Sequence, residues 1–418
     1  MSAVCFFFSI HEPFFLRRYS VFDLGQNSLY EDDERNYAHV HGMAQRCYLP
    51  AIDLLLRKIR EFNGEFRFAC HVSIPAIELF EQYEPDVLAG LKALADTKAV
   101  EFVAGAAHSL AFLYSRTEFL RQLKDYCALT EKLFNQNPRC FCSTELIYNN
   151  DFAAFLDAQN FKVMLAEGTD HILGWRSLNF LYKAESAEKM ALLLRNAKLS
   201  QDISLNFRNR NWDQWPLTAP KYAEWCRASA QNTDIINLFL NFNVLGGVND
   251  ASTGIFGFME DLPKELFARG ISFMTPQDAA KTLTVQDTIS VHHFISWDDA
   301  GGDLNSWLGN DMQKDAVHFL YSLADEVHAL NDPVLTHDFR RLQTSDYLRW
   351  MSTKWFSNHL PTNSPYAKSQ DAYTTYMNIL ADFEMRLDEA IEKKNLQEAK
   401  ANANGLTENK KKNKQMVA

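Results

Sequence analysis

The sequence lacks several features, and each absence excludes a class of protein. No apolar run in its 418 residues is long enough to span a bilayer, and the short run from Cys5 to Ile10 follows no basic start. Positive charge is also scarce, because 42 Lys and Arg face 53 Asp and Glu, for a formal net charge of -11. Nucleic acid and anionic membranes would repel such a chain. We therefore expect a cytoplasmic protein with no nucleic-acid or membrane partner.

Cysteine is scarce and irregularly spaced. The seven residues include one close pair, Cys140 and Cys142, and no second pair that would complete a tetrahedral metal site. Buried, reduced thiols are expected, and neither a metal nor another cofactor is predicted. A glycine-rich phosphate loop is also missing after the first apolar run, which disfavours a nucleotide-binding fold.

Short apolar runs alternate with longer amphipathic stretches. The runs are rich in Phe, Val, Ile and Leu without strict polar alternation, which is typical of strands buried on both faces of a parallel sheet. Strands are predicted at residues 4–10, 66–72, 100–104, 139–144, 162–166, 190–194, 235–242 and 271–274. Helices are predicted at residues 45–62, 77–96, 118–134, 151–160, 220–228 and 255–269. This alternation predicts an α/β barrel or an open doubly wound sheet.

Near residue 304 the pattern changes to helices without strands between them. These helices are predicted at residues 311–330, 333–356 and 372–394. We therefore divide the chain into a catalytic-type α/β domain at 1–300, a helical domain at 301–395 and a polar tail at 396–418. The tail ends in a run of lysines, and its composition predicts disorder.

Polar residues follow most of the predicted strands. In a parallel barrel the carboxyl ends of the strands meet at one face, where the active site lies. Any one of these residues alone is more often a loop or capping residue, and it is their convergence that marks a candidate site. They are His11, Glu12, His71, His108, Glu145, Glu167, Asp170, His171, Arg195, Asn196, Asn241 and Asn243.

Ordered motifs along the chain carry a more specific signal. They are His11 to Phe14, Arg17 to Asp23, His108 to Ala111, Thr144 to Asn149, Glu167 to Asp170, Gly174 to Ser177, Asn209 to Trp212, Trp307 to Asn310 and Arg341 to Asp346. In this order they resemble glycoside hydrolase family 57, and within it the α-amylase-like branch, from Val4 to about Phe383.

The resemblance implies a (β/α)7 barrel followed by an α-helical domain. It also implies a retaining mechanism on α-linked glucans such as starch or glycogen, without a metal. The catalytic nucleophile would be Glu145, and the general acid, an aspartate in the family, falls on Asn241. Substrate-binding roles are expected for His11, Glu12, His108, Trp175, Arg176, Trp212, Gln343 and Asp346.

Position 241 is the main departure from the family. An amide has nearly the shape of a carboxyl group but no titratable proton, so Asn241 can bond to the glycosidic oxygen without protonating it. Loss of the general acid costs on the order of 10²–10⁴ in rate. A second departure is the small, apolar stretch from Ala104 to Ala107, where the family carries a Gly-Glu-Thr-like stretch with tyrosines. The sequence therefore predicts an inactive or strongly impaired α-amylase-like protein whose remaining activity is glucan binding.

Three alternatives stay open. An active α-glucan hydrolase or 4-α-glucanotransferase would need a substitute acid, for which the candidates are Glu12, Glu167, Asp170 and Asp250. A zinc hydrolase would use three histidines near strand ends, although no His-x-His or His-Glu-x-x-His spacing supports it; they are His11, His71 and His108. A non-catalytic binding protein would stack aromatic rings on sugar, with Trp175, Trp212, Trp215, Trp307 and Tyr347 as candidates.

Overall fold

Seven parallel strands of the described chain close into a barrel. The computed structural model describes residues 2–26, 28–298, 301–354 and 364–415, with side chains up to residue 401. The barrel strands are β1 (Ala3–Ile10), β2 (Phe68–Val72), β3 (Val100–Phe102), β4 (Cys140–Phe141), β5 (Val163–Glu167), β7 (Ala191–Arg195) and β8 (Ile235–Asn241). They form two parallel sheets, β3-β2-β1-β8 and β7-β5-β4.

The two sheets join at both of their edges. On one side a parallel bridge pairs Ala104, just after β3, with Phe141 in β4. On the other side the amide of Asn196, just after β7, donates to the carbonyl of Asn237 in β8 at 2.8 Å. The ring of strands is thus complete, and the expected (β/α)7 barrel is confirmed.

Three short strands lie outside this ring. The strand β9 (Ser272–Phe273) pairs with the beginning of β1. The strand β6 (Leu181–Ala184) pairs antiparallel with β7, and β10 (Asp287–Ile289) pairs with β6. The sequence pattern predicted β9 but neither β6 nor β10.

The barrel strands are buried on both faces, which explains their continuous apolar sequences. In β1, Cys5 and Phe7 face the barrel interior, whereas Phe6 and Phe8 pack in the layer between strands and helices. The interior is completed by Ala69, Val103, Cys140, Cys142, Val163, Leu165, Leu193 and Phe239. All seven cysteines are free thiols, and six of them are buried.

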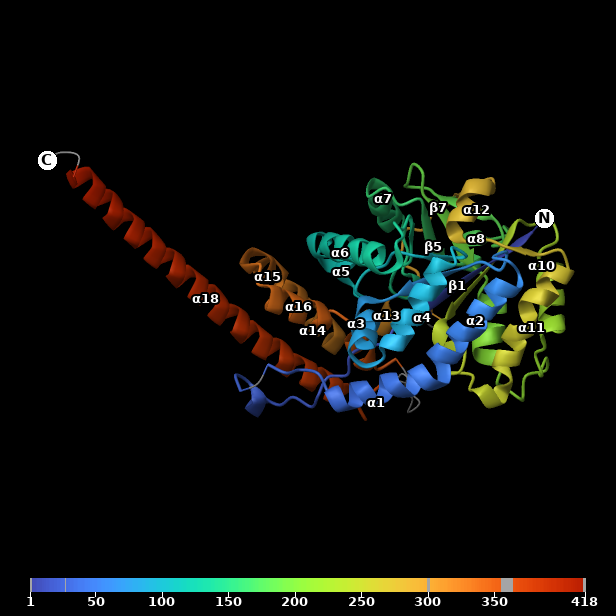
Figure 1. The fold of residues 1–418 in the computed structure, drawn as a ribbon, viewed down its shortest axis with the longest axis horizontal. Coiled ribbons are helices and arrows are strands. Elements are labelled where there is room, and N and C mark those ends of the chain that lie inside the picture. Colours follow the sequence, from blue (N-terminus) through green and yellow to red (C-terminus); the bar gives the residue numbers. More distant parts are fainter. Residues whose placement is uncertain (1, 27, 299–300, 355–363, 416–418) are drawn as a thin grey trace.

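Helices cover the barrel from outside (Figure 1). They include α1 (Asp33–Met43), α2 (Leu49–Glu61), α3 (Ile74–Tyr83), α4 (Pro85–Asp96), α6 (Arg116–Phe134), α7 (Asn150–Ala158), α10 (Ala219–Ser229), α11 (Ile255–Ala268) and α12 (Pro276–Thr282). The single helix predicted at 77–96 is two helices, because Pro85 disfavours a helical conformation at Glu84, which has φ -138°.

The helical domain packs against one side of the barrel. It contains α13 (Asn305–Leu308), α14 (Asp311–Ser322), α15 (Ala324–Leu330), α16 (Pro333–Leu342), α17 (Asp346–Trp350) and the beginning of α18 (Ser369–Gln415). Each of the first two predicted helices is divided in two, and the end of the second, at 355–356, lies outside the described residues. The domain shares one apolar core with the barrel helices, in which Trp307 and Tyr347 are fully buried.

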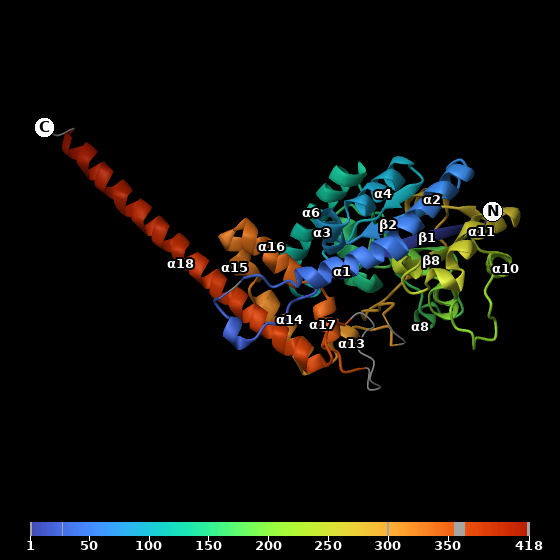
Figure 2. The same ribbon diagram turned by 60° about the horizontal axis from the view of Figure 1, so that its bottom comes forward.

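The last helix, α18, projects far from the rest of the molecule (Figures 1 and 2). Among its side chains that the structure describes, Leu387 is the last buried one, and every side chain from Glu392 to Ala401 is exposed. It continues to Gln415, through the segment for which composition predicts disorder. Ala, Glu, Lys and Gln are common both in disordered segments and in exposed helices, so composition did not separate the two.

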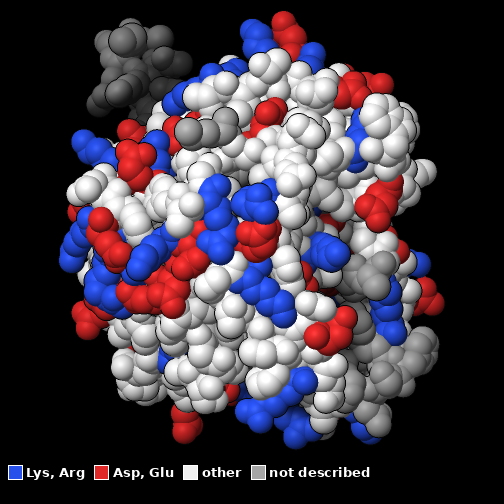
Figure 3. All heavy atoms as spheres, turned by 90° about the vertical axis from the view of Figure 1, so that its right-hand side faces the viewer, with Lys and Arg blue, Asp and Glu red and all other residues white. Residues whose placement is uncertain are grey.

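The described helices are not long apolar spans, and the face in Figure 3 carries charges of both signs. No described helix combines the length and the apolarity that crossing a bilayer requires. On the face shown in Figure 3, Lys and Arg lie interspersed with Asp and Glu, and neither sign of charge forms a large patch of its own.

Candidate active site

A cleft opens at the carboxyl end of the barrel strands, with about 1110 Å³ of empty space when open solvent is included. Glu145 lies in a helical turn after β4, Arg195 ends β7, and Asn241 ends β8. All three line the cleft, together with Gln201, Ser204, Leu205, Phe239, Leu240, Asn243, Val244, Val248, Trp297, Asp298 and Arg349. The fold thus brings the expected nucleophile and the asparagine at the acid position to one cavity.

Glu145 is held in a fixed and unusual conformation. Its backbone lies in the left-handed region, with φ 46° and ψ 37°, which non-glycine residues rarely adopt. The indole of Trp297 donates to its carboxylate, and the amide of Trp297 donates to its carbonyl at 3.0 Å. Burial alone would raise the pKa of Glu145, but the hydrogen bond and charge of His108, with Arg349 further away, bring it below the ordinary value. Glu145 is therefore ionised at neutral pH, as a nucleophile must be.

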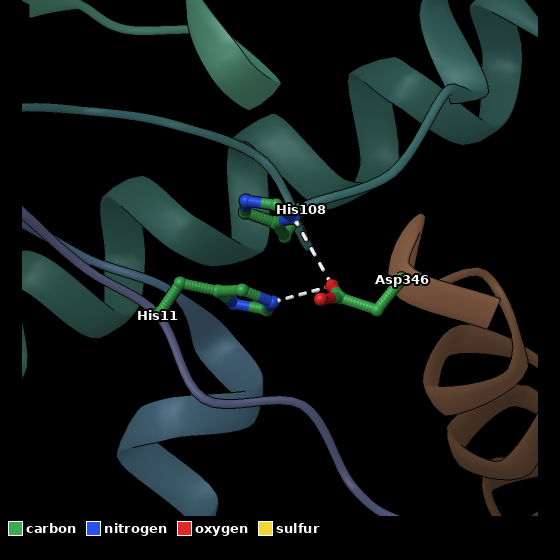
Figure 4. A group of neighbouring side chains, drawn as sticks. All are labelled: His11, His108 and Asp346. Carbon is green, nitrogen blue, oxygen red and sulfur yellow. Dashed lines mark hydrogen bonds and ion pairs between the residues drawn. The ribbon is translucent and has the colours of Figure 1, made fainter. Parts of the chain in front are cut away.

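Figure 4 shows two histidines and an aspartate that lie together, and one of them, His108, contacts Glu145. The Nε2 atom of His11 is 2.8 Å from Oδ2 of Asp346, and Nε2 of His108 is 3.6 Å from Oε1 of Glu145. The two imidazole rings are stacked, with centroids 3.5 Å apart and planes at 3°. Burial would raise the pKa of Asp346, but the adjacent His11 and His108 lower it strongly. Asp346 belongs to α17, so the helical domain completes this site.

This group does not fit a catalytic metal ion. His11, His108 and Asp346 each offer one ligand atom, and these atoms lie within 4.8 Å of one another. The lone pair of an imidazole nitrogen lies in the ring plane, and two parallel planes about 3.5 Å apart cannot both contain one ion. The third histidine of the zinc alternative, His71, lines a small cavity with His108, but it is not one of the three grouped ligand atoms, and its Nδ1 is 3.2 Å from the carbonyl of Val103.

The four candidate substitute acids lie in different surroundings. Glu12 is buried and accepts hydrogen bonds from Tyr48 and His39. Asp170 is exposed in a short helix, α8 (Asp170–Leu173), and Asp250 accepts from the amide of Ser252 at 2.8 Å.

Among these four acids, Glu167 is the one for which a contact with a residue of the cleft wall is described. Its Oε2 lies 3.1 Å from a terminal nitrogen of Arg195. Burial raises the pKa of Glu167 to about 7, although the charge of Arg195 acts in the opposite direction. Glu167 is therefore the one substitute acid with both a proton near neutral pH and a contact with the cleft.

None of the eight expected substrate-binding residues is part of the cleft wall itself. His108 contacts the nucleophile position and carries His11 and Asp346 with it. Glu12 is buried nearby in the chain, whereas the other four are exposed or make contacts elsewhere. Trp175 is 96% exposed, and the Arg176 guanidinium bonds to Asp287 at 3.0 Å. Trp212 packs edge-on against another tryptophan ring, that of Trp225. Gln343 is buried and donates to Glu118 at 2.9 Å. Of the remaining stacking candidates, Trp215 is 44% exposed, while Trp307 and Tyr347 are buried in the core.

Trp297, Asp298 and Arg349 are among the cleft residues that sequence reasoning missed. Trp297 and Asp298 lie in a loop after β10, and Arg349 lies in α17. Asp298 and Arg349 form an ion pair with N···O 2.5 Å. No periodic pattern marks the loop, and in a helix of the second domain an arginine is usually a surface residue. The pairing between these distant segments exists only in three dimensions.

Known proteins share this architecture over most of the chain. The Glycosyl hydrolase family 57 model matches residues 5–292. A protein of Methanocaldococcus jannaschii named "Putative alpha-amylase" is 33% identical over 410 residues, which cover 93% of this chain and 86% of that protein.

Two solved structures show a similar fold. A family 57 branching enzyme from Thermococcus kodakaraensis matches with TM-score 0.68 and 14% identity, over 92% of this chain and 90% of that chain. A 4-alpha-glucanotransferase from Thermococcus litoralis matches with TM-score 0.60 and 15% identity, over 83% of this chain, which spans only 56% of the length of that enzyme. At these identities the likeness shows the fold, whereas the family model and the closer relative show descent. The chain belongs to glycosyl hydrolase family 57.

Proposed function

We propose that the protein acts on α-glucans through a retaining framework with an intact nucleophile, Glu145, and no general acid at position 241. The observation that carries this proposal is that Glu145 and Asn241 line the same cleft. The relatives support the substrate class, since their names describe an alpha-amylase, a branching enzyme and a 4-alpha-glucanotransferase. The free, mostly buried cysteines support a reducing compartment, which we take to be the cytoplasm.

The missing proton affects both halves of a retaining reaction. In the first half the nucleophile attacks the anomeric carbon while an acid protonates the departing sugar oxygen. In the second half the same group, now a base, activates water. The amide of Asn241 can do neither, so hydrolysis of natural α-glucans should be slower by on the order of 10²–10⁴ than with a carboxyl group there.

The second carboxylate in the cleft wall does not replace the acid. Asp298 is ion-paired with Arg349. A guanidinium has only donors, so the aspartate accepts hydrogen bonds in this pair and does not donate one. Of the two carboxyl groups in the cleft wall, Glu145 is therefore the one that can react with a sugar.

Substrates whose leaving group needs no proton test this proposal directly. With α-glucosyl fluoride or an activated aryl α-glucoside, Glu145 should be glycosylated, and the adduct should accumulate because no base activates water. Peptide mass spectrometry would locate the added glucosyl unit, and azide should release it as α-glucosyl azide. Glu145→Gln is the matched control and should not be labelled. Hydrolysis of amylose by the unmodified protein at an ordinary enzymatic rate, about 1–10³ s⁻¹, would show that the proposal is wrong.

A second candidate is an active hydrolase or transferase that uses Glu167 as its acid. The favouring observation is a buried carboxyl group with a pKa of about 7 that bonds to Arg195 on the cleft wall. An acid is most effective when its pKa lies near the working pH. This candidate requires fast hydrolysis by the unmodified protein and loss of that activity in Glu167→Gln. A slow unmodified protein excludes it.

A further inference from the structure

The absence of an acid at position 241 restricts which leaving groups the cleft can expel. A sugar alkoxide is a poor leaving group and needs a proton from the protein as the bond breaks. A phosphate leaves as a stable anion, because its second pKa is about 6. A donor with phosphate on its anomeric carbon would therefore need only the nucleophile Glu145, which the cleft retains.

The cleft wall carries groups that suit such an anion. Two guanidinium groups, those of Arg195 and Arg349, line it. Guanidinium is the side-chain group best matched to phosphate, because its donors form a fixed planar fork. Neutral hydrogen-bonding side chains line the same wall, namely Gln201, Ser204, Asn241 and Asn243.

Arg195 is oriented by contacts on three sides. Its Nε donates to the carbonyl of Phe239 at 3.1 Å, and one terminal nitrogen lies 3.1 Å from Glu167. Its guanidinium lies 5.0 Å from the centroid of the Trp297 ring. Since the indole of Trp297 also donates to Glu145, one side chain links the nucleophile to this cation. A leaving group that departs from a sugar on Glu145 therefore has a fixed positive charge nearby.

The net charge of the cleft wall also becomes more positive during the reaction, which favours binding of the anionic leaving group. Before reaction two carboxylates, Glu145 and Asp298, face two guanidinium groups, Arg195 and Arg349. Esterification of Glu145 removes one negative charge, which leaves two cations facing one anion. The wall thus becomes net positive at the moment when a phosphate anion is released into it.

We propose that the cleft takes an α-glucosyl donor whose leaving group is a phosphate or nucleoside diphosphate anion and transfers the glucosyl unit to a hydroxyl of an α-glucan. This inference rests on the proposed function, because it needs Glu145 as the nucleophile and no acid at Asn241. In the first step a Glu145 oxygen forms a bond to the anomeric carbon, and the bond from that carbon to the phosphate oxygen breaks. A glucosyl phosphate in its monoanionic form releases HPO₄²⁻, and a nucleoside diphosphate sugar releases the nucleoside diphosphate, in neither case with a proton from the protein.

In the second step the acceptor hydroxyl attacks the anomeric carbon, and the ester bond to Glu145 breaks. The proton of that hydroxyl passes to the phosphate that still occupies the cleft, so HPO₄²⁻ becomes H₂PO₄⁻. Two displacements at one carbon retain the α configuration. The phosphate thus acts as the base that position 241 does not supply.

The test compares three donors on the full-length protein with maltotetraose as acceptor. The donors are α-glucose 1-phosphate, uridine diphosphate glucose and α-glucosyl fluoride, and the readouts are release of phosphate, nucleoside diphosphate or fluoride together with elongation of the acceptor. We expect elongation with at least one of the two phosphate donors, and the reactive one identifies the source of the phosphate. Glu145→Gln should abolish the reaction with every donor.

Variants of the two arginines separate phosphate binding from folding. In Arg195→Lys, Arg195→Met and Arg349→Met we expect kcat/KM for the phosphate donor to fall about 10- to 100-fold, as for the loss of a charge-assisted hydrogen bond. With the fluoride donor kcat/KM should fall by at least about threefold less than with the phosphate donor, and the melting temperature of each variant shows that it folds. The control is Arg210→Met, an arginine outside the cleft that lies over the ring of Trp215.

The possible outcomes distinguish this inference from the proposed function. Labelling of Glu145 by the fluoride without any reaction of either phosphate donor would overturn the inference and leave the proposed function standing. No labelling by the fluoride would mean that the proposed function fails. Equal losses for fluoride and phosphate donors in the arginine variants would also overturn the assignment of Arg195 and Arg349 to the leaving group.

Discussion

Asn241→Asp should restore a general acid and is the most informative single substitution. The change replaces an amide by a carboxyl group of nearly the same shape at an exposed position at the end of β8, so the fold should be unaffected. General acid catalysis contributes on the order of 10²–10⁴. We expect a gain at the lower end of this range, about 10²-fold in kcat for maltoheptaose, because the new group is protonated only part of the time.

The pH dependence follows from the charges around the cleft. An ordinary aspartate has a pKa of about 3.9, and the ionised Glu145 in the same cleft raises that of a new neighbour, while Arg195 and Arg349 lower it. The variant is active when residue 241 is protonated and Glu145 is ionised. Its activity should therefore rise as the pH falls from 8 towards 5, and decline only where Glu145, whose pKa lies below the ordinary value, begins to take up a proton.

The prediction is tested by measuring the release of reducing ends from maltoheptaose over this pH range. Asn243→Asp is the matched control. Asn243 lines the same cleft and its substitution adds the same charge, but it stands two residues beyond the acid position. An equal gain in both variants would show that added charge, and not the position of the acid, is responsible. No gain at position 241, with an unmodified protein that is slow on glucans, would refute the assignment of Asn241 as the acid position.

Three further predictions concern stability. Gly105→Ala should destabilise the fold by about 1–3 kcal/mol in a denaturant titration, because an added Cβ would lie 2.1 Å from the buried ring of His71, whereas Gly257→Ala, with no atom within 4 Å, should not. Burial lowers the pKa of His71 to about 3, below the unfolded value of about 6.5, so the neutral ring favours folding above pH 6.5 and this advantage is lost as the pH falls. About 2 kcal/mol should disappear between pH 7 and pH 5, and thermal denaturation of His71→Gln should show a flatter profile over that range. Removal of residues 398–418 should leave the melting temperature unchanged, whereas truncation before Leu387, the last buried one among the described side chains of α18, should lower it.

The strands of the barrel were predictable because burial on both faces leaves a direct mark on the sequence. In β1 the run from Val4 to Phe8 is apolar at every position, and all of it is buried. The two strands that were missed carry no such mark, since Asp287 and Thr288 of β10 are exposed and Lys183 of β6 is only half-buried. Their pairing depends on the neighbouring strand and not on local apolarity.

The candidate site was predictable where its residues follow strands, and not where distant segments meet. Glu145, Asn241 and Arg195 stand at strand ends and were candidates from the sequence. Trp297 orients Glu145 from a loop more than 150 residues further along the chain, and Arg349 approaches from the helical domain. No local pattern identifies such partners, because their role comes from contacts between segments that are far apart in the sequence.

The two candidate catalytic positions differ in backbone strain. Glu145 and Leu146 have φ 46° and 53°, and His108 beside them has φ 53°, each costing on the order of 1–3 kcal/mol for a non-glycine residue. Asn241 lies in relaxed, extended backbone, with φ -72° and ψ 136°. A protein that only bound glucan would gain stability by relaxing the turn at Glu145, because binding does not require a carboxylate held at one fixed angle. A carboxylate held at one angle is what the proposed covalent step at Glu145 requires, whereas the backbone at Asn241 carries no such constraint.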